Sequence, residues 1–528
     1  MKKVKRKLKA TVKPNLIDKA FSYFAPVKAA RRMRSRMAME VFNSYTGASK
    51  SRRSVKEWNP HGNDADSDLL PDLPTLRDRS RDLVRNNPLA AGAIKTKVTS
   101  VVGTGLRLQS RIDRDVLNLT DDQADEWEAK TEREWKKLFW DLKDTDIART
   151  LNGADRTSQV YQQAKENGDV FILLPRLTRL GCPYDLKLQI IEADRVTNKD
   201  SKQDTDKLSG GIGRDTYGAP IEYDILQNHP GSIQPKMKWD TIPAFGTKTG
   251  LRNIIHLFRP TRPGQSRGVP DLAAVMEPLK QLGKYTDAEI DAAVLSAFFT
   301  VFVETENGQG GFDFTNIGPE TGAKSSDKDV KLGPGMIVDL AAGEKVHDSN
   351  PGRPNTAFDG FVMSIFRLIG VGLEMPFEML IKHFQSSYSA SQAAIMEFVK
   401  YVMSERRWLT DNFLKLVYEV WMYEAVTSGR IAAPGYLSDP AIMAAYLSCE
   451  FVGDANGQIK ETDAVKAASL RVAGKFSTLA EETTKLTGGD WDKNHKQQVK
   501  EQKKQIADGL ILDPNEPVEP VQAGVNNA

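Results

Sequence analysis

The strongest constraint on the fold is a long helical pattern that begins at Ser389. Ser389 followed by Gln392 fits a helix-capping box, and the pattern stays helical until Gly429. At about 1.5 Å per residue, a helix of about 40 residues is about 60 Å long. Soluble domains rarely contain such a helix unless it forms a spine or lies along a large assembly. We therefore expect the chain to build around one long helix.

The first half of the chain mixes helices and strands. A helical pattern over residues 76–100 is interrupted at Pro88, and residues 101–107 indicate a turn or a strand pair. Thr120 and Gln123 fit a second capping box, which opens a helix to about Lys143 with Trp127 and Trp135 expected in the core. Short apolar runs predict strands at residues 169–175, 186–192, 221–226 and 253–258. The predicted fold class is α+β, mostly helical.

Two further helices flank a polar insert in the second half. Residues 270–300 follow a helical pattern, with a kink expected at Pro278, and residues 356–372 form a second helix. The segment between them is rich in Gly, Asp, Ser and Lys, with a strand-like piece near residues 335–340. Residues 460–507 are again helical and charged, and the acidic tail 508–528 contains no Lys or Arg and is expected to be disordered.

The charge is unevenly distributed along the 528 residues. Residues 1–57 contain 17 Lys and Arg but only 3 Asp and Glu, a local charge of +14, while the whole chain carries +3. The other 471 residues therefore carry −11. A dense cationic arm attracts phosphates irrespective of sequence. This arm is either a solubilising or partner-binding tail, or a direct contact to nucleic acid or scaffold.

The arm also has a short apolar pattern. Residues 15–25 predict an amphipathic helix capped by Asn15 and ended by Pro26, followed by the cationic stretch 31–36.

Several classes of protein are excluded by composition. Two cysteines 267 positions apart, Cys182 and Cys449, cannot form a disulfide scaffold, a cysteine-rich zinc module or an iron–sulfur centre, and indicate a reduced intracellular compartment. No apolar run is long enough to span a bilayer, and no signal-peptide core follows the basic N-terminus. The six histidines do not have the spacing of metal ligands.

No catalytic constellation stands out. A phosphate-binding P-loop and a dinucleotide fingerprint are both absent from the sequence. Residues 264–268 match the G-x-S-x-G pattern of serine hydrolases around Ser266. In that motif the serine sits on a sharp turn between strand and helix, whereas here a Pro- and Arg-rich loop separates Ser266 from the strand. We expect neither an enzyme nor a cofactor.

Several sequence segments resemble segments of the lambda-type family of tailed-phage portal proteins and occur in the same order as in that family. They span about residues 76–435 and are RDRSRDLVRNNPLA (77–90), VVGTGLRLQ (101–109), NGDVFILL (167–174), IIEADRV (190–196), IIHLFRPTRPGQSRGVPDLA (254–273), LGPGMIVDLAAGEKV (332–346), SSYSASQAAIMEFVKYVMSERRWL (386–409) and WMYEAVTSGRI (421–431). One departure is Gln392, where the family usually has arginine; this puts in doubt any contact attributed to that arginine.

The resemblance implies a portal architecture. The expected parts are the basic arm (1–57), a wing (58–265), a first stem helix (266–300), an α/β clip (301–352), a second stem helix (353–372), a tunnel loop (373–388), a spine helix of the wing (389–435), a helical crown (436–507) and the tail (508–528).

The function implied is passage of double-stranded DNA through a ring of twelve subunits at one capsid vertex, during packaging and later ejection. The implied partners are further copies of the chain, the DNA, the large terminase subunit, a head-completion protein, scaffold and major capsid protein, with no membrane. The protein would be assembled in the host cytoplasm and would reside in the virion. The alternatives are another head–tail connector or minor capsid protein, a hydrolase or nuclease, and a DNA-binding protein that uses its arm.

The resemblance also places candidate site residues. Lys382, His383 and Gln385 fall in the tunnel loop, where Lys382 and His383 either face DNA phosphates or are simply solvated. Candidates for the subunit interface are Arg259, Arg262, Arg267 and Gln392; the three arginines are expected to form salt bridges between subunits, with DNA contact as the alternative. The clip around Asp313, Lys324, Lys328 and Lys331 is expected to dock the terminase and then the head-completion protein.

Overall fold

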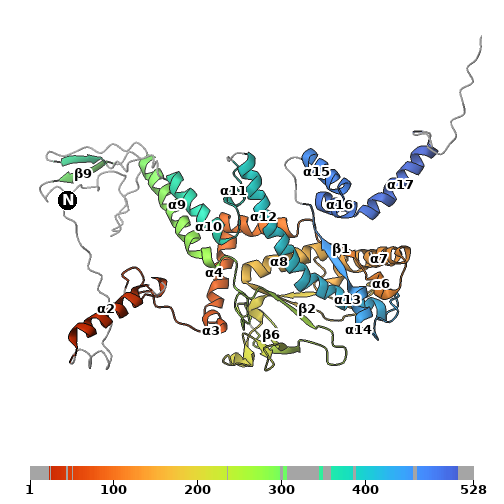
Figure 1. Cartoon of the computed structure of the whole chain (residues 1–528), viewed down its shortest axis with the longest axis horizontal. Helices are drawn as coiled ribbons and strands as arrows, with labels where there is room; N and C mark the ends of the chain where they lie inside the picture. Colours follow the sequence, from red (N-terminus) through yellow and green to blue (C-terminus); the bar gives the residue numbers. More distant parts are fainter. Residues whose placement is uncertain are drawn as a thin grey trace, which may run out of the picture. The chain divides into compact units, whose positions relative to one another are not determined.

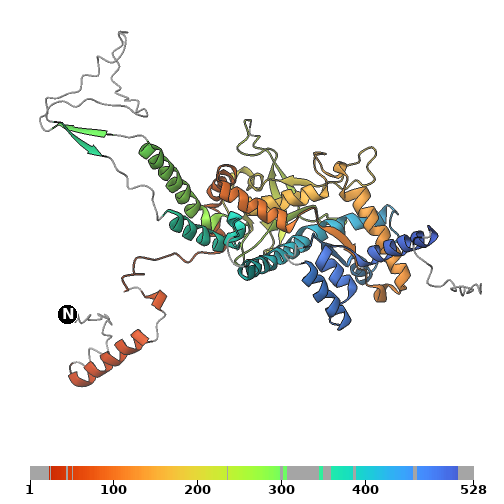
Figure 2. The same ribbon diagram turned by 90° about the horizontal axis from the view of Figure 1, so that it is seen from above.

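The chain forms two compact units, Met1–Asp64 and Ala65–Ala528. The structure is a computed structural model that describes residues 23, 25–42, 46–49, 52–234, 236–297, 301–305, 344–348, 358–384, 388–455, 461–508 and 510. Figure 1 labels the elements used below, and Figure 2 shows them from above.

The first unit contains a helix that begins at Pro26, the residue expected to end the preceding helix. Helix α2 (Pro26–Phe42) begins at this proline and includes the cationic stretch 31–36; a short 3-10 helix, η1 (Thr46–Ala48), follows. Proline suits the first turn of a helix because its missing N–H has no partner there in any case. Most of the helix expected over residues 15–25 lies outside the described residues.

The expected long helix is confirmed in the second unit. It runs without interruption as α12 (Tyr388–Leu409), the π-helical segment η8 (Thr410–Leu414) and α13 (Lys415–Thr427). Ser389, the expected capping residue, lies inside the helix. Gly429 follows with φ 73°, in the left-handed region that glycine adopts without strain. In Figures 1 and 2 the helix crosses from α11 towards α14.

The N-terminal helices follow their local signals. The predicted break at Pro88 is confirmed: α4 (Leu73–Asn86) ends before it, and the Asn87 side chain caps α5 (Pro88–Val101). The capping box of Thr120 and Gln123 is also confirmed at the start of α7 (Asp121–Trp135), which continues as the π-helical segment η2 (Lys136–Trp140). The remaining helices here are α3 (Ala65–Leu69), α6 (Arg114–Leu117) and α8 (Gly153–Asn167).

Two antiparallel sheets lie between the helices. The first has the order β3-β2-β8 and consists of β3 (Gln189–Ile191), β2 (Asp169–Leu173) and β8 (Ile254–Phe258). The second has the order β4-β5-β6-β7, from β4 (Leu208–Ser209), β5 (Ile212–Arg214), β6 (Pro220–Leu226) and β7 (Trp239–Pro243). The four predicted strands are confirmed, but β4, β5 and β7 had no clear apolar run.

The main core forms around the long helix. Trp135 of α7 packs edge-on against Trp421 of α13, with ring centroids 5.1 Å apart, and stacks on Trp140 at 4.8 Å. Trp135 is buried as predicted, whereas Trp127 is only half-buried. The long helix is thus held along its C-terminal half by aromatic packing.

Residues 102–104 form a turn, one of the two alternatives expected for residues 101–107. The strand that follows, β1 (Arg107–Ser110), pairs antiparallel with the distant β11 (Cys449–Val452). Tyr436, Tyr446 and Phe451 are buried in the main core, next to α14 (Pro440–Leu447). Residues 436–452 therefore pack with the main core and β1, whereas the helical crown was expected to begin at residue 436.

A helix, an insert and a second helix follow one another along the chain, as expected. A 3-10 turn, η6 (Ala273–Val275), precedes α9 (Met276–Ala297), and α10 (Phe358–Gly372) follows the antiparallel pair of β9 (Val301–Thr305) and β10 (Glu344–Asp348). Pro278 lies in the first turn of α9, not in mid-helix, because α9 begins later than predicted. The strand-like piece near 335–340 lies outside the described residues.

Three helices follow β11. They are α15 (Glu461–Ala473), α16 (Leu479–Thr487) and α17 (Trp491–Ala507), so the helical pattern predicted for 460–507 is confirmed. Most of the acidic tail lies outside the described residues.

Two carboxylates of α7 accept hydrogen bonds from backbone N–H groups of β1 and of the residues that follow it. Glu132 Oε1 accepts a hydrogen bond from the Ser110 N–H at 3.0 Å, and Glu128 Oε1 accepts one from the Ile112 N–H at 2.8 Å. Burial raises the pKa of Glu128 to about 7, although the Ile112 N–H opposes this shift.

We predict that Glu128→Gln stabilises the protein at neutral and alkaline pH. Glu128 has a higher pKa in the folded chain than its ordinary 4.5, so native stability falls as the pH rises from about 4.5 to about 7. Glutamine keeps the acceptor oxygen without the charge. After allowance for solvent screening of a half-buried group, urea unfolding at pH 8 should show a gain of about 1 kcal/mol that disappears below pH 4.5. Glu126→Gln, on the exposed face of α7, is the control; an equal gain there would mean only a general relief of negative charge.

Candidate functional site

The predicted tunnel loop contains a short helix held between two left-handed residues. Helix α11 (Phe377–Ile381) is preceded by Glu374 at φ 53° and followed by Lys382 at φ 55°. The N–H of His383 donates to the carbonyl of Glu378 at 3.1 Å. Because left-handed backbone is unfavourable for residues other than glycine, surrounding contacts must hold both turns.

Buried apolar side chains supply that support. Ile369, Leu373, Met375 and Leu380 all belong to the main core, while Lys382 and His383 are exposed. Gln385 lies outside the described residues. The segment therefore presents a lysine and a histidine to solvent from an anchored turn.

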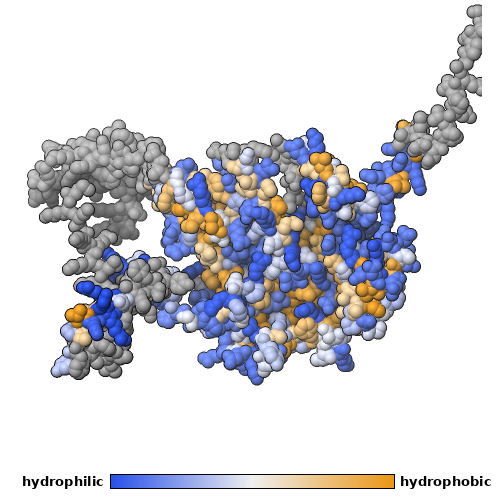
Figure 3. Space-filling view, in the orientation of Figure 1, coloured by the Kyte–Doolittle hydropathy of each residue, from blue (hydrophilic) through white to orange (hydrophobic). Residues whose placement is uncertain are grey.

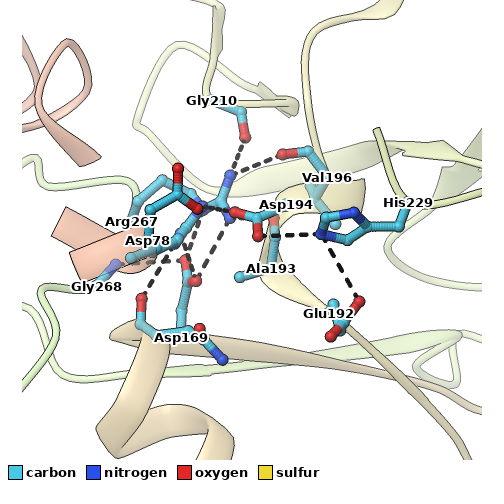
Figure 4. Close-up of polar contacts among 12 residues, drawn as sticks. Asp78, Asp169, Glu192, Ala193, Asp194, Val196, Gly210, His229, Arg267 and Gly268 are labelled. Atoms are coloured by element: carbon cyan, nitrogen blue, oxygen red, sulfur yellow. Dashed lines mark hydrogen bonds and ion pairs between the residues drawn. The ribbon is translucent and has the colours of Figure 1, made fainter. Parts of the chain in front are cut away.

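Beneath the base of α9, a buried set of charges surrounds Asp169. We call it the Asp169 cluster, and it consists of Arg77 of α4, Asp169 of β2, Asp194, His256 of β8 and Arg267. Arg77 Nη2 donates to Asp169 Oδ1 at 2.7 Å, and Arg267 Nε donates to Asp169 Oδ2 at 2.5 Å. His256 Nε2 lies 3.3 Å from the same Asp169 Oδ2. Figure 4 shows the Arg267 side chain next to Asp169 and to the backbone of Val196 and Gly210, with Asp194 nearby.

The electrostatics of the Asp169 cluster depend on complete pairing. Burial alone would raise the pKa of Asp169, but Arg267 and Arg77 outweigh it and hold this pKa well below its usual range. Burial lowers the pKa of His256 to about 4, against the opposing effect of Asp169. His256 is stacked between Phe171 and Phe258, at 4.1 and 4.3 Å between ring centroids. At neutral pH the histidine is therefore an uncharged, packed side chain.

The position of Arg267 corrects its predicted role. It is 2% exposed, and Nη1 donates to the carbonyls of Val196 at 2.8 Å and Gly210 at 2.7 Å, while Nη2 donates to Ala193 at 2.7 Å. Since these internal acceptors and Asp169 occupy its guanidinium, Arg267 cannot form a salt bridge with another subunit. It fixes the loop after β8 instead.

That loop also makes a close backbone crossing. A Cβ atom on Gly268 would lie 1.9 Å from the carbonyl oxygen of Gly168, so no other residue fits there without movement. The crossing and Arg267 together set where the chain enters η6 and α9.

A second set of buried charges joins the start of α9 to the long helix. We call it the Glu405 cluster: Lys97 of α5, Lys165 of α8, Arg259, Asp271 and Glu405 of α12. Glu405, 1% exposed, contacts Lys165 Nζ at 2.8 Å through Oε2 and Arg259 Nη1 at 2.8 Å through Oε1. Lys97 pairs with Asp271, and burial lowers its pKa.

The other interface candidates lie nearer the surface. Arg259 is half exposed and its guanidinium also lies 5.0 Å from the centre of the Trp408 ring; Arg262 pairs with Asp68 at 2.7 Å. Gln392 is exposed on α12. Their contacts with another subunit remain predictions. Asp313, Lys324, Lys328 and Lys331 lie outside the described residues.

Ser266 does not have the geometry of a nucleophile elbow. It lies in the loop between β8 and η6, is 1% exposed, and its N–H donates to Asp66 Oδ1 at 2.7 Å. A nucleophile must be reachable at a strand-to-helix turn, and this serine is enclosed.

The next two observations concern metal binding and membrane spans in the part of the chain that the structure describes. No group of three or more His, Cys, Asp or Glu side chains is arranged to hold a metal ion there. Nor does any described helix combine the length and apolar character needed to cross a membrane.

The sequence reasoning missed the members of both clusters other than Arg259 and Arg267. The signal for three of them was a charged or polar residue in an apolar pattern: Asp169 begins DVFIL, His256 interrupts IIHLF, and Glu405 lies on the long helix. A buried charge needs a partner, but the sequence does not say which one.

Comparison with known proteins gave a family and several relatives. The family model described as phage portal protein, lambda family, matches residues 51–406. Portal protein B of Escherichia phage lambda is 25% identical over 492 residues, covering 89% of this chain and 91% of the relative. The portal protein of Escherichia phage N15 is 25% identical over 477 residues, covering 86% and 89%.

Solved structures gave more distant matches. A chain from the neck of a native GTA particle, computed with C12 symmetry, is 15% identical, with 79% of this chain and 93% of that chain covered and a TM-score of 0.42. A chain from the virion of a native gene transfer agent particle is 15% identical, covers 81% and 94%, and has a TM-score of 0.40.

We predict that Asp169→Asn strongly destabilises the fold. The substitution leaves Arg77 and Arg267 buried without their shared carboxylate, and breaking a buried ion pair from one side costs about 3–5 kcal/mol. The free energy of unfolding in urea measures the loss. Asp206→Asn, in an exposed loop, is the control and should change stability by less than about 0.5 kcal/mol. Equal stability of the two variants would contradict the role of the Asp169 cluster.

Proposed function

The chain belongs to the lambda family of phage portal proteins, and from that membership we propose that its copies form a ring at one capsid vertex through which double-stranded DNA passes. The observation that carries the proposal is the family match over residues 51–406. This range includes α9, β9, β10, α10, α11 and most of α12. The matched range therefore contains the parts of the chain that we expect to form the stem, the clip and the tunnel loop of the ring.

Exposed apolar side chains on α10 support subunit packing. Phe361, Leu368 and Val371 recur at helical spacing on one face, and Leu368 and Val371 are 61% and 79% exposed. Figure 3 shows apolar residues at the surface over α9 and α10. An exposed apolar stripe of this kind is typical of an interaction surface. In the proposed ring it packs against the next subunit.

The charge distribution supports passage of DNA without tight binding. Every phosphate contact adds salt-dependent affinity and therefore resists sliding. Residues 58–528 carry −11, and Lys382 and His383 are the two basic side chains among the described tunnel-loop residues after Ile381. We assign these two side chains to the neighbourhood of the DNA backbone.

The proposed partners follow from the same family. The segment around β9 and β10 docks the terminase during packaging and a head-completion protein afterwards, and scaffold and major capsid protein surround the ring in the capsid. Assembly takes place in the host cytoplasm, and the mature protein is part of the virion. Another head–tail connector remains the alternative, and a ring with an axial channel built from α9 and α10 distinguishes the portal.

We predict that Leu368→Asp combined with Val371→Asp prevents ring formation while the subunit stays folded. Head-to-tail contacts must close into a ring, and two carboxylates in that contact oppose it. Native mass spectrometry should show at least about a tenfold loss of rings. The control is Leu180→Asp with Ile233→Asp, two fully exposed apolar residues outside the stem. If the unmodified protein gives only monomers and two-fold dimers under all conditions, the ring is wrong.

We further predict that Lys382→Glu with His383→Ala leaves rings intact but changes DNA packaging or retention. A carboxylate next to the DNA repels phosphates where the lysine attracted them, so filled particles should change by at least about threefold. DNA content per particle, measured by nuclease protection, gives the readout. Lys400→Glu, an exposed lysine on α12, is the control. Unchanged packaging and retention in the double variant would remove both residues from the channel.

A further inference from the structure

A half-open cavity of about 290 Å³ lies at the end of the second unit away from α9 and α10 (Figures 1 and 2). It is formed where α6, the start of α7 and α14 meet. Its apolar wall consists of Val116, Leu117, Leu119, Trp127, Ala432, Pro434, Ile442 and Tyr446. Only Asn118 and Gln123 add polar side chains to the lining.

The aromatic wall of the cavity is held in place. Trp127 Nε1 donates to the carbonyl of Ala432 at 2.8 Å, and its ring centroid lies 5.1 Å from that of Tyr446. The Trp127 side chain is therefore oriented by the loop after the long helix and by α14, yet it stays half-exposed. Pre-oriented aromatic side chains are the usual anchors of protein interfaces.

The chain around this cavity is strongly acidic. Residues 113–127 contain six Asp and Glu and one Arg, and residues 432–446 contain one Asp and no Lys or Arg. Asp113 and Asp439 cap helices, and Asp121 pairs with Arg114 at 2.6 Å. The other four acids, Asp115, Asp122, Asp125 and Glu126, are exposed and have no ion-pair partner in the part of the chain that the structure describes.

The volume and the polarity of the cavity limit the kinds of ligand that it can hold. The volume is at the lower end of the range for small-molecule sites and the lining offers few convergent polar groups, so the cavity suits one or two side chains better than a cofactor. Val116, in the wall of the cavity, is 47% exposed and leaves apolar surface accessible at its edge. Carboxylates beside an apolar socket favour a cationic partner through complementary potential.

We propose that this acidic socket, defined by Leu119, Trp127, Ile442 and Tyr446 with Asp122 and Glu126 on the neighbouring flank of α7, docks a segment of a partner protein that inserts an apolar side chain and flanks it with Lys or Arg. The apolar anchor supplies the affinity, and the carboxylates select the charge and speed association. The docking site does not depend on ring formation, because a single subunit contains it complete.

The test uses the full-length protein and two fluorescein-labelled peptides of equal length. One alternates leucine pairs with lysine pairs, and the other alternates leucine pairs with glutamate pairs. Fluorescence anisotropy at low and moderate salt should show binding of the leucine–lysine peptide that weakens with salt, and binding of the leucine–glutamate peptide at least about tenfold weaker.

Variants separate the cavity from its charge. Ala432→Phe fills the cavity and should weaken the leucine–lysine peptide about tenfold or more, with the salt dependence retained. Asp122→Lys with Glu126→Lys should weaken it by a similar factor and abolish the salt dependence. The matched control, Glu461→Lys with Asp463→Lys, reverses two exposed charges in the first turn of α15 and should leave binding unchanged. Thermal unfolding confirms that each variant is folded.

The outcomes are distinct. Binding that is lost in the two socket variants and kept in the control supports the proposal. Equal binding of both peptides, equal loss in the control, or binding unaffected by Ala432→Phe overturns it, because the interaction would then be apolar adhesion or general attraction to an acidic surface. A further outcome would also overturn the proposal: the protein forms dimers that disappear in Ala432→Phe, and neither peptide binds. In that case a second copy of the chain occupies the socket.

Discussion

Two buried charge clusters hold the sheet, the base of α9 and the long helix in one arrangement. In the Asp169 cluster, Arg267 reaches from the loop after β8 to the carboxylate of β2 and to three backbone carbonyls. In the Glu405 cluster, Lys165 joins the long helix to Asp271 at the entry to α9. An unpaired buried charge is far more costly than the pair is favourable, so each cluster is stable only when all its members are in place.

This constraint explains the arrangement of the proposed channel parts. Helix α9 leaves a base fixed by Asp271, and the turn after α11 is anchored by core residues such as Leu373 and Leu380. The left-handed turns at Glu374 and Lys382 persist because that core holds them. A rigid base with exposed apolar side chains on α10 is what repeated head-to-tail packing into a ring requires.

The distribution of polar groups differs between the two ends of the second unit. Around α10 the exposed surface is apolar and, in our proposal, contacts identical subunits. Around α6, α7 and α14 the chain near an aromatic cavity carries exposed carboxylates that have no ion-pair partner among the described residues, which favours a partner of opposite charge. The two ends of the unit therefore suit different kinds of partner.

The sequence alone determined the features that depend on neighbouring residues. The long helix, the break at Pro88, the capping box at Thr120 and the order of helix, insert and helix all follow from short-range propensities and periodicity, and the family resemblance rests on the same linear order. Pro26 shows the limit of such rules, since it was expected to end a helix and it begins α2.

Only the tertiary structure decided the long-range pairings. Arg267 appeared to be a surface cation until the fold placed Asp169, 98 positions earlier in the chain, beside it. The pairing of β1 with β11 joins residues 449–452 to a strand more than 300 positions earlier, and the partly exposed Trp127 lines the cavity of the acidic socket. Charge pairing and burial act between residues that the chain brings together on folding, and that proximity is not encoded in any local pattern.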